Sequence, residues 1–217
     1  LGLIKARKFH QWEGGEGKVA AQYLTALYQL AKAAVEKEDY AEAKELLLRA
    51  VGEYPHNLGE GKLESGQENN LYYLLGLVQE KLGEAKDAFE SLTRACCGES
   101  EPVGMMYYND QPPEMIYYQG LAYRMLGEEE QAVRRFQKLV DYGREHIRDD
   151  VKIDYFAVSL PDLLIFEENL NERNRKHCLF MMSLGLKGLG RIDEAEKCAE
   201  ELLAMDNAHQ EIRVHDL

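Results

Sequence analysis

Residues 126–136 read Leu126-Gly127-Glu128-Glu129-Glu130-Gln131-Ala132-Val133-Arg134-Arg135-Phe136, and this stretch decides the fold. Its glycine ends one amphipathic helix, and the alanine five residues later lies in the first turns of the next helix. The same spacing recurs within residues 38–43, 82–88 and 189–195. Four copies of a helix–turn–helix unit predict a helical repeat array.

Positions counted from the four alanines share residue types. A small residue lies twelve positions before each alanine, and a small or aliphatic residue lies seven positions after it. The alanines are Ala43, Ala88, Ala132 and Ala195, the earlier residues are Ala31, Gly76, Gly120 and Ser183, and the later ones are Ala50, Ala95, Leu139 and Leu202. Small side chains allow the two antiparallel helices of a hairpin to approach closely.

This pattern resembles the tetratricopeptide repeat (TPR) family, and the resemblance covers all four units. It implies an all-α fold, a right-handed α-α superhelix of about four helical hairpins. The gaps between the alanines all exceed the ~34-residue period of the family, so the hairpins carry long insertions. We predict a single domain over residues 1–217, with an N-terminal cap segment at 1–18, hairpins at about 19–55, 69–97, 114–147 and 172–205, and insertions at 56–68, 98–113 and 148–171. The polar tail at 206–217 is expected to fray.

Three short sequence motifs, largely outside the hairpins, resemble a more specific group within the TPR proteins. Residues 12–18, 108–114 and 154–162 look like parts of the C-terminal TPR region of large bacterial proteins that have an N-terminal domain of unknown function. The resemblance implies a bacterial protein of which this chain is a C-terminal region, with a contextual link to carbohydrate metabolism.

The charge balance disfavours two classes of partner. The net charge is −13 and the pI is about 5.0, whereas nucleic acids and anionic membranes attract clustered Lys and Arg. No apolar run approaches the ~20 residues that span a bilayer. We therefore expect a cytoplasmic protein with neither partner, in which Cys96, Cys97, Cys178 and Cys198 are reduced thiols.

The sequence predicts no catalytic centre, metal or cofactor. The glycine-rich stretch at 13–19 is not a phosphate loop, because Trp12 takes the place of the first glycine and Val19 the place of Ser or Thr. Neither HExxH nor a Ser or Cys nucleophile signature is present. The insertion carboxylates are interpreted as solvated loop charge, although a pair of them would suit glycoside hydrolysis; these residues are Glu13, Glu16, Glu60, Asp110, Glu114, Asp154 and Asp162.

An aromatic residue stands fifteen positions before each alanine, at the first-helix position that faces the concave groove in TPR arrays. These residues are Tyr28, Tyr73, Tyr117 and Phe180, with Lys32, Asn70, Glu114 and His177 at flanking groove positions. Either a ligand uses the aromatics or the protein covers them itself. Lys32 alone matches the clamp that binds chaperone tails, which disfavours a co-chaperone role.

The leading interpretation is a non-catalytic protein–protein interaction scaffold. Its partner is a protein or peptide, and one candidate is the N-terminal region of the same larger protein. The alternative is a carbohydrate-binding or carbohydrate-processing accessory domain, and an enzyme with carboxylate chemistry is a weaker third. The insertion residues that would serve these alternatives are Trp12, Glu13, Tyr108, Asn109, Asp110, Asp154, Tyr155 and Phe156. The apolar segment at 153–166 is expected either to fold back into the groove or to form an interface.

Overall fold

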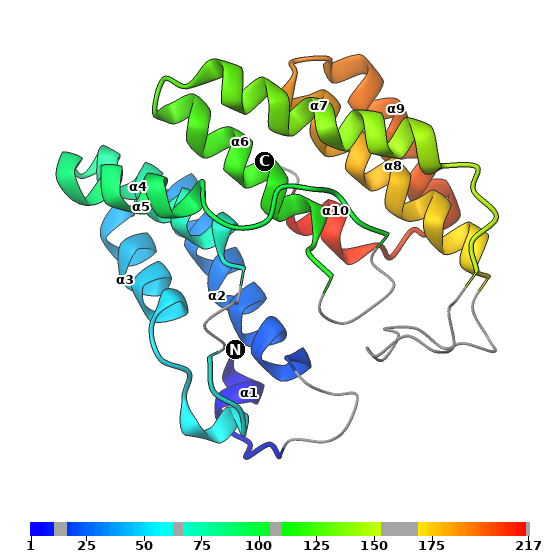
Figure 1. The fold of residues 1–217 in the computed structure, drawn as a ribbon. Coiled ribbons are helices and arrows are strands. Elements are labelled where there is room, and N and C mark those ends of the chain that lie inside the picture. Colours follow the sequence, from blue (N-terminus) through cyan, green and yellow to red (C-terminus); the bar gives the residue numbers. More distant parts are fainter. Residues whose placement is uncertain (11–16, 63–66, 105–109, 153–168, 216–217) are drawn as a thin grey trace. The chain divides into compact units, whose positions relative to one another are not determined.

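The computed structural model describes the chain except for residues 11–16, 63–66, 105–109, 153–168 and 216–217 (Figure 1). The regular structure within the described ranges is entirely helical, which confirms the predicted all-α class. The chain forms two compact units, Leu1–Ala95 and Cys96–Leu217, and each is described by itself. The prediction of a single domain over the whole chain stays a prediction.

The first unit contains two helical hairpins. α2 pairs with α3 and α4 pairs with α5, while α3 also packs on α4. Its elements are α1 (Gly2–Lys5), α2 (Lys18–Glu36), α3 (Tyr40–Val51), the 3₁₀ turn η1 (His56–Leu58), α4 (Asn69–Lys81) and α5 (Ala85–Ala95). Asn57 holds the N-terminal segment by donating to the carbonyl oxygens of Ile4 and Arg7, each at 2.9 Å.

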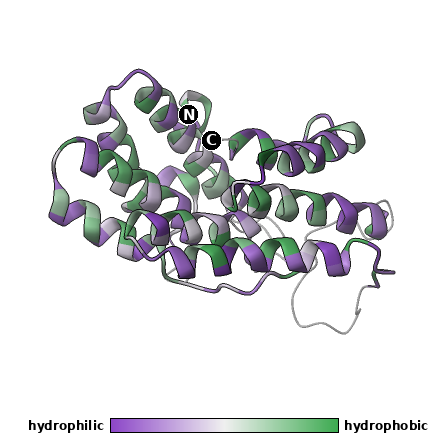
Figure 2. Ribbon diagram, turned by 90° about the horizontal axis from the view of Figure 1, so that it is seen from above, coloured by the Kyte–Doolittle hydropathy of each residue, from purple (hydrophilic) through white to green (hydrophobic). Residues whose placement is uncertain are grey.

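The second unit contains two further hairpins and a short closing helix. α6 pairs with α7 and α8 pairs with α9, and α8 also packs on α7 and α6. Its elements are α6 (Pro113–Met125), α7 (Glu129–His146), α8 (Leu170–Gly188), α9 (Ile192–Met205) and α10 (Gln210–Val214). Hydrophobic and hydrophilic residues alternate along the helices (Figure 2). α2, α3, α5 and α7 bury one side, whereas α6 and the second half of α8 are buried nearly all round.

Each hairpin turns at a residue in the left-handed backbone region. Gly83, Gly127 and Gly190 have φ angles of 77°, 81° and 74°, and Glu38 takes the same place in the first hairpin at 59°. The amide of the next residue then bonds to a carbonyl five residues back, as in the bond from Glu128 N to Tyr123 O at 2.9 Å. Glycine carries no Cβ penalty in this conformation, which explains why the glycine-to-alanine spacing marks the hairpins.

The four repeat alanines and the residues seven positions after them are buried. A Cβ atom added at Gly76 would lie 2.7 Å from Leu92 Cγ, and one added at Gly120 would lie 2.4 Å from Phe136 Cε1. The small residues therefore permit close helix contact within hairpins, as the spacing predicts. Phe136, the last residue of the stretch that decides the fold, fills the space left by glycines on both α6 and α8.

The expectation that the tail frays is wrong for its described part. Residues 210–214 form α10, and His215 directly after it is buried. The Tyr118 hydroxyl lies 3.1 Å from His215 Nδ1, which holds the end of α10 against α6. The sequence suggested fraying because the tail is polar, but its histidines make the contacts.

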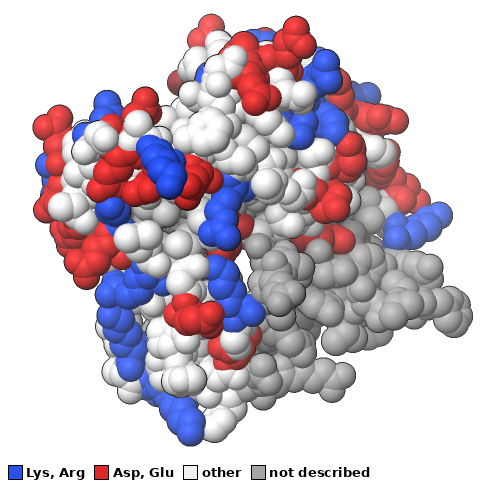
Figure 3. All heavy atoms as spheres, turned by 60° about the vertical axis from the view of Figure 1, so that its left-hand side comes forward, with Lys and Arg blue, Asp and Glu red and all other residues white. Residues whose placement is uncertain are grey.

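Surface charge of both signs is interspersed on the face that Figure 3 shows. None of the helices in the described ranges is both long and apolar enough to cross a bilayer.

Candidate functional site

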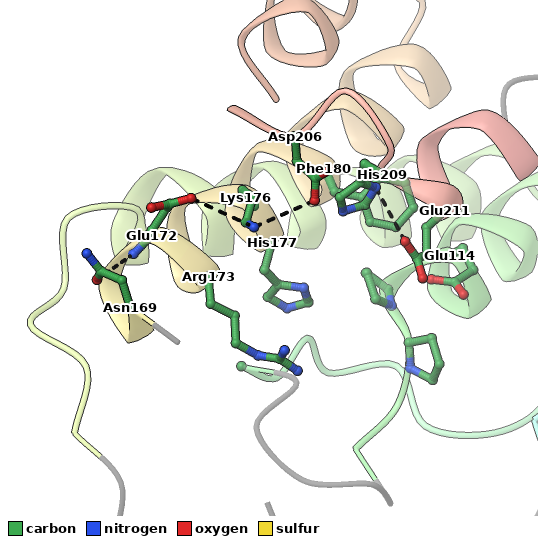
Figure 4. A pocket seen from close by; sticks show the side chains of 13 residues that line it. Glu114, Asn169, Glu172, Arg173, Lys176, His177, Phe180, Asp206, His209 and Glu211 are labelled. Carbon is green, nitrogen blue, oxygen red and sulfur yellow. Dashed lines mark hydrogen bonds and ion pairs between the residues drawn. The ribbon is translucent and has the colours of Figure 1, made fainter. Parts of the chain in front are cut away.

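A cleft of about 700 Å³ lies within the second unit, between the start of α6, the first turns of α8 and the segment that leads into α10 (Figure 4). It is lined by Gly104, Pro112, Pro113, Glu114, Asn169, Glu172, Arg173, Lys176, His177, Phe180, Asp206, His209 and Glu211. Three of the predicted groove residues, Glu114, His177 and Phe180, meet here.

Local sequence signals place three helix starts around the cleft. Pro113 is the first residue of α6, where a missing amide donor costs nothing. The Asn169 side chain accepts from the amides of Asn171 and Glu172 at the start of α8. His209 Nδ1 lies 3.4 Å from the Ile212 amide at the start of α10. The first turns of all three helices contribute acidic residues to the cleft.

Glu114 is the most unusual residue of the cleft. Its side chain is buried, and its Oε2 has no hydrogen-bond partner among the described residues. Its Oε1 lies 3.7 Å from His215 Nε2, beyond hydrogen-bond length. Burial, with a further contribution from the charge of Glu211, raises the pKa of Glu114 to about 7. This carboxyl group therefore changes its charge near neutral pH.

His177 is held in a neutral form. Its Nε2 lies 2.7 Å from the Val103 carbonyl oxygen, which only accepts, so Nε2 carries the proton. Burial lowers the pKa of His177 to about 4, against an opposing effect of this hydrogen bond. Its Nδ1 is consequently an acceptor.

The remaining side chains give the cleft two chemically distinct ends. Lys176 pairs with Glu172 at 3.9 Å and with Asp206 at 3.6 Å. Figure 4 shows Glu114 beside Glu211 at one end and Arg173 near His177 at the other. The Phe180 and His209 rings, with centroids 5.5 Å apart, form an aromatic wall.

Phe180 also borders a second cavity of about 300 Å³ between α8, α9 and α10. Residues of α10 line both cavities, with Glu211 in the first and Ile212 and Arg213 in the second. The C-terminal segment of the chain therefore covers part of the Phe180 ring, which is one of the two outcomes expected for the groove aromatics.

The other predicted groove residues lie elsewhere. Tyr117 is buried against the rings of Tyr118 and Phe136, at centroid distances of 5.5 and 5.7 Å, and does not line the cleft. Four belong to the first unit: Tyr28, which is buried, and Lys32, Asn70 and Tyr73, which are partly buried. Lys32 Nζ lies 5.9 Å from the centre of the Tyr28 ring. A binding role for these residues stays a prediction.

Most of the predicted insertion residues lie outside the described part of the chain: Trp12, Glu13, Tyr108, Asn109, Asp154, Tyr155 and Phe156. The segment at 153–166 also lies outside it, so the fold-back hypothesis stays a prediction. Asp110 is described and is partly buried. Glu60, one of the insertion carboxylates, accepts from the amides of Gly17 and Ala20 and so stabilises the start of α2.

Sequence reasoning missed the contribution of the tail and of charged residues on α8. The residues missed are Arg173, Lys176, Asp206, His209, Glu211 and His215. Arg173 and Lys176 lie one helical turn before the groove positions His177 and Phe180, and this spacing could have predicted that they line the same face of α8. The tail offers no apolar periodicity, so nothing in the sequence placed it beside α8.

Three of the cysteines, Cys96, Cys178 and Cys198, are not activated thiols. Burial raises the pKa of Cys96 and Cys178 to about 12 and also raises that of Cys198. A thiol with a raised pKa is a weak nucleophile at neutral pH. Within the described ranges, no group of three or more His, Cys, Asp or Glu side chains is arranged to hold a metal ion.

Comparisons with known proteins identify the repeats. Two tetratricopeptide-repeat family models match the chain, one over residues 28–102 and the other over residues 114–142. Two solved structures described as crystal structures of MamA are similar. The first is 17% identical, with 92% of this chain and 98% of that chain covered and a TM-score of 0.32. The second is 18% identical, with 93% and 81% covered and a TM-score of 0.31. Residues 28–102 and 114–142 therefore carry tetratricopeptide repeats.

Proposed function

We propose that this tetratricopeptide-repeat chain is a non-catalytic scaffold that binds an extended segment of a partner protein, and that the cleft of the second unit receives that segment. The repeats support a protein partner, because helical hairpins of this kind present a surface rather than a reactive centre. The observation that carries the proposal is the cleft itself. It combines an aromatic wall with convergent polar groups, the composition expected of a binding site.

The proposal also concerns a larger protein to which this chain would belong, and its location in the cell. The motifs at 12–18, 108–114 and 154–162 support a bacterial protein of which this chain is the C-terminal region, and the charge balance and the cysteine usage support a cytoplasmic location. The N-terminal region of that protein is then one candidate partner, and it would bind in cis with a high effective concentration.

A peptide library tests the proposal. The whole chain is used to select binders from random peptides, and hydrogen–deuterium exchange then locates the selected peptide. We expect slower exchange at residues 170–180 and 206–214. Control segments within 69–95 should not change.

Two outcomes overturn the proposal. One is protection confined to segments outside the cleft. The other is a failure to select any peptide together with a rise in melting temperature on addition of sugars, which would favour the carbohydrate alternative. Glu211→Gln serves as the cleft variant because its side chain is 53% exposed, and Glu130→Gln on α7, at 92% exposure, serves as the matched control.

A further inference from the structure

Glu114 lines the cleft with a buried carboxyl group that has an unmet hydrogen-bonding requirement among the described residues. The residue is only 7% exposed, it lines the cleft, and within the described part of the chain its Oε2 has no hydrogen-bond partner. His215 does not meet the requirement, because its Nε2 is 3.7 Å from the other oxygen and its Nδ1 is engaged with Tyr118. Buried polar atoms without a partner are rare in folded proteins and call for an explanation. A donor supplied by a ligand would complete this site.

The charges around Glu114 favour a ligand whose hydrogen-bond donor is positively charged. Four carboxylates and two cationic side chains line the cleft. Lys176 is already paired with two of these carboxylates, Glu172 and Asp206. Figure 4 shows Glu211 next to Glu114, whereas Arg173 lies at the other end. The end of the cleft around Glu114 is thus acidic, and an anionic group would be repelled there.

The apolar surfaces beside this end suit a long aliphatic stem. Phe180 and His209 form one wall, and Pro112 and Pro113 form part of another. Lys and Arg side chains bury their methylene stems along apolar surfaces and keep the charged end on polar groups. A cation beside an aromatic ring also gains from the ring quadrupole.

We propose that the cleft takes a lysine or arginine side chain of the partner segment, with its charged end between the carboxylates of Glu114 and Glu211 and its stem along Phe180. The inference rests on the proposed function, because it names the chemistry of the segment bound in the same cleft. The net charge of −13 favours the approach of a basic segment.

A cation bound between the two carboxylates favours the ionised form of Glu114. The titratable groups near this carboxyl are Glu211 and His209 from the tail and His215 after α10. Since Glu114 has a pKa of about 7 without ligand, binding below that pH displaces a proton. Affinity should then fall up to tenfold for each pH unit below 7 and should be nearly constant above pH 8.

The test uses four pools of acetylated heptapeptides that are random except for a fixed central residue, which is lysine, arginine, norleucine or glutamate. Binding to the whole chain is measured by fluorescence polarisation at pH 8. We expect the lysine and arginine pools to bind at least tenfold more tightly than the other two. Glu114→Gln should lower the affinity of the lysine pool about tenfold without changing the norleucine pool. Glu211→Gln, at a more exposed residue, should lower it about threefold, and Glu130→Gln should have no effect.

The outcomes separate this inference from the proposed function. If the norleucine or glutamate pool binds as tightly as the lysine pool and protects residues 170–180 from exchange, the cation site is refuted and the peptide scaffold survives. If no pool binds, or if protection lies outside the cleft, both are refuted. Circular dichroism melts establish that each variant is folded, and the Glu211→Gln result decides the matter if Glu114→Gln unfolds.

Discussion

Replacing Gly120 by alanine is expected to destabilise the second unit, even though alanine is the better helix former. The added Cβ atom would lie 2.4 Å from Phe136 Cε1 and 2.7 Å from Cζ. The ring has little room to move, because a Cβ atom at Gly188 on α8 would lie only 2.2 Å from Phe136 Cδ1. Phe136 is fully buried, so its ring occupies a slot bounded by backbone on two helices.

The expected size of the effect follows from two opposing contributions. Overpacking a well-packed core costs up to about 3 kcal/mol. Alanine in place of glycine inside a helix gains about 1 kcal/mol. The net loss should therefore be about 2 kcal/mol in the free energy of unfolding. Gly76→Ala provides a milder comparison. Its Cβ atom would lie 2.7 Å from Leu92 Cγ, on a side chain that can rotate away, and 3.3 Å from the Ala88 carbonyl oxygen.

Hydrogen exchange under native conditions can measure this loss of stability in the second compact unit separately from the first. A loss of about 2 kcal/mol corresponds to roughly 30-fold faster exchange of the most protected amides. We expect this acceleration in peptides from α6, α7 and α8, with α2 to α5 unchanged. In a Phe136→Leu background, the cost of Gly120→Ala should shrink by about 1 kcal/mol or more, because the smaller side chain leaves space for the methyl group. Slower exchange in the single variant, or an equal cost in both backgrounds, would refute the reasoning.

Further predictions concern the turn residues, the titrating groups and α10. Glu38→Gly should raise the free energy of unfolding by about 1 kcal/mol in urea denaturation, because a non-glycine residue there has a φ of 59°, and Gly127→Ala should lower it by a similar amount. Glu114→Gln should make the chain more stable than wild type by about 3 kcal/mol at pH 8 and by little at pH 4.5. The reason is that the folded wild type holds its proton up to a pKa of about 7, against 4.5 unfolded, and so loses stability as the pH rises between these values. His177→Gln should remove a pH dependence of stability with the opposite sign. The wild-type histidine has a pKa of about 4 in the folded state against 6.5 in the unfolded state, so the free energy of unfolding falls by up to about 3 kcal/mol as the pH is lowered from 6.5 to 4. Tyr118→Phe should speed exchange in α10 severalfold and leave α7 unchanged, since the hydroxyl contacts His215.

The hairpins could be predicted because their signals are local. The residue that ends a first helix must adopt a left-handed backbone conformation, and a glycine there is visible in the sequence. The second helix of the unit then begins within two residues, as α7 does at Glu129 after Gly127. The counted positions also placed Gly120 against the neighbouring helix, because helix geometry fixes which residues share a face.

The candidate site could be predicted only in part, because several of its residues are brought together by contacts between distant parts of the chain. Glu114 and His177 occupy fixed positions in the repeat, so counting from the alanines found them. The neighbours of Glu114 come from the tail, and the hydrogen bond of His177 comes from Val103, 74 residues earlier, so both environments join residues far apart in the chain. The contact between Tyr118 and His215 spans 97 residues and rests on one hydrogen bond and one ring contact. Contacts of that kind leave no periodic trace in the sequence.

The position of the cleft within the second unit has a physical reason in the way repeats bury one another. Tyr117 and Phe180 occupy equivalent positions in successive hairpins, yet Tyr117 is enclosed by neighbouring rings and Phe180 borders two cavities. α6 is covered because α8 packs on it as well as α7. The described chain offers α8 only the five-residue α10 on that side, and a helix so short cannot fill the same space. Cavities of about 700 and 300 Å³ remain. The cleft therefore lies where the described helices leave space beside the first turns of α8, and Glu114 Oε2 has no hydrogen-bond partner among the described residues there.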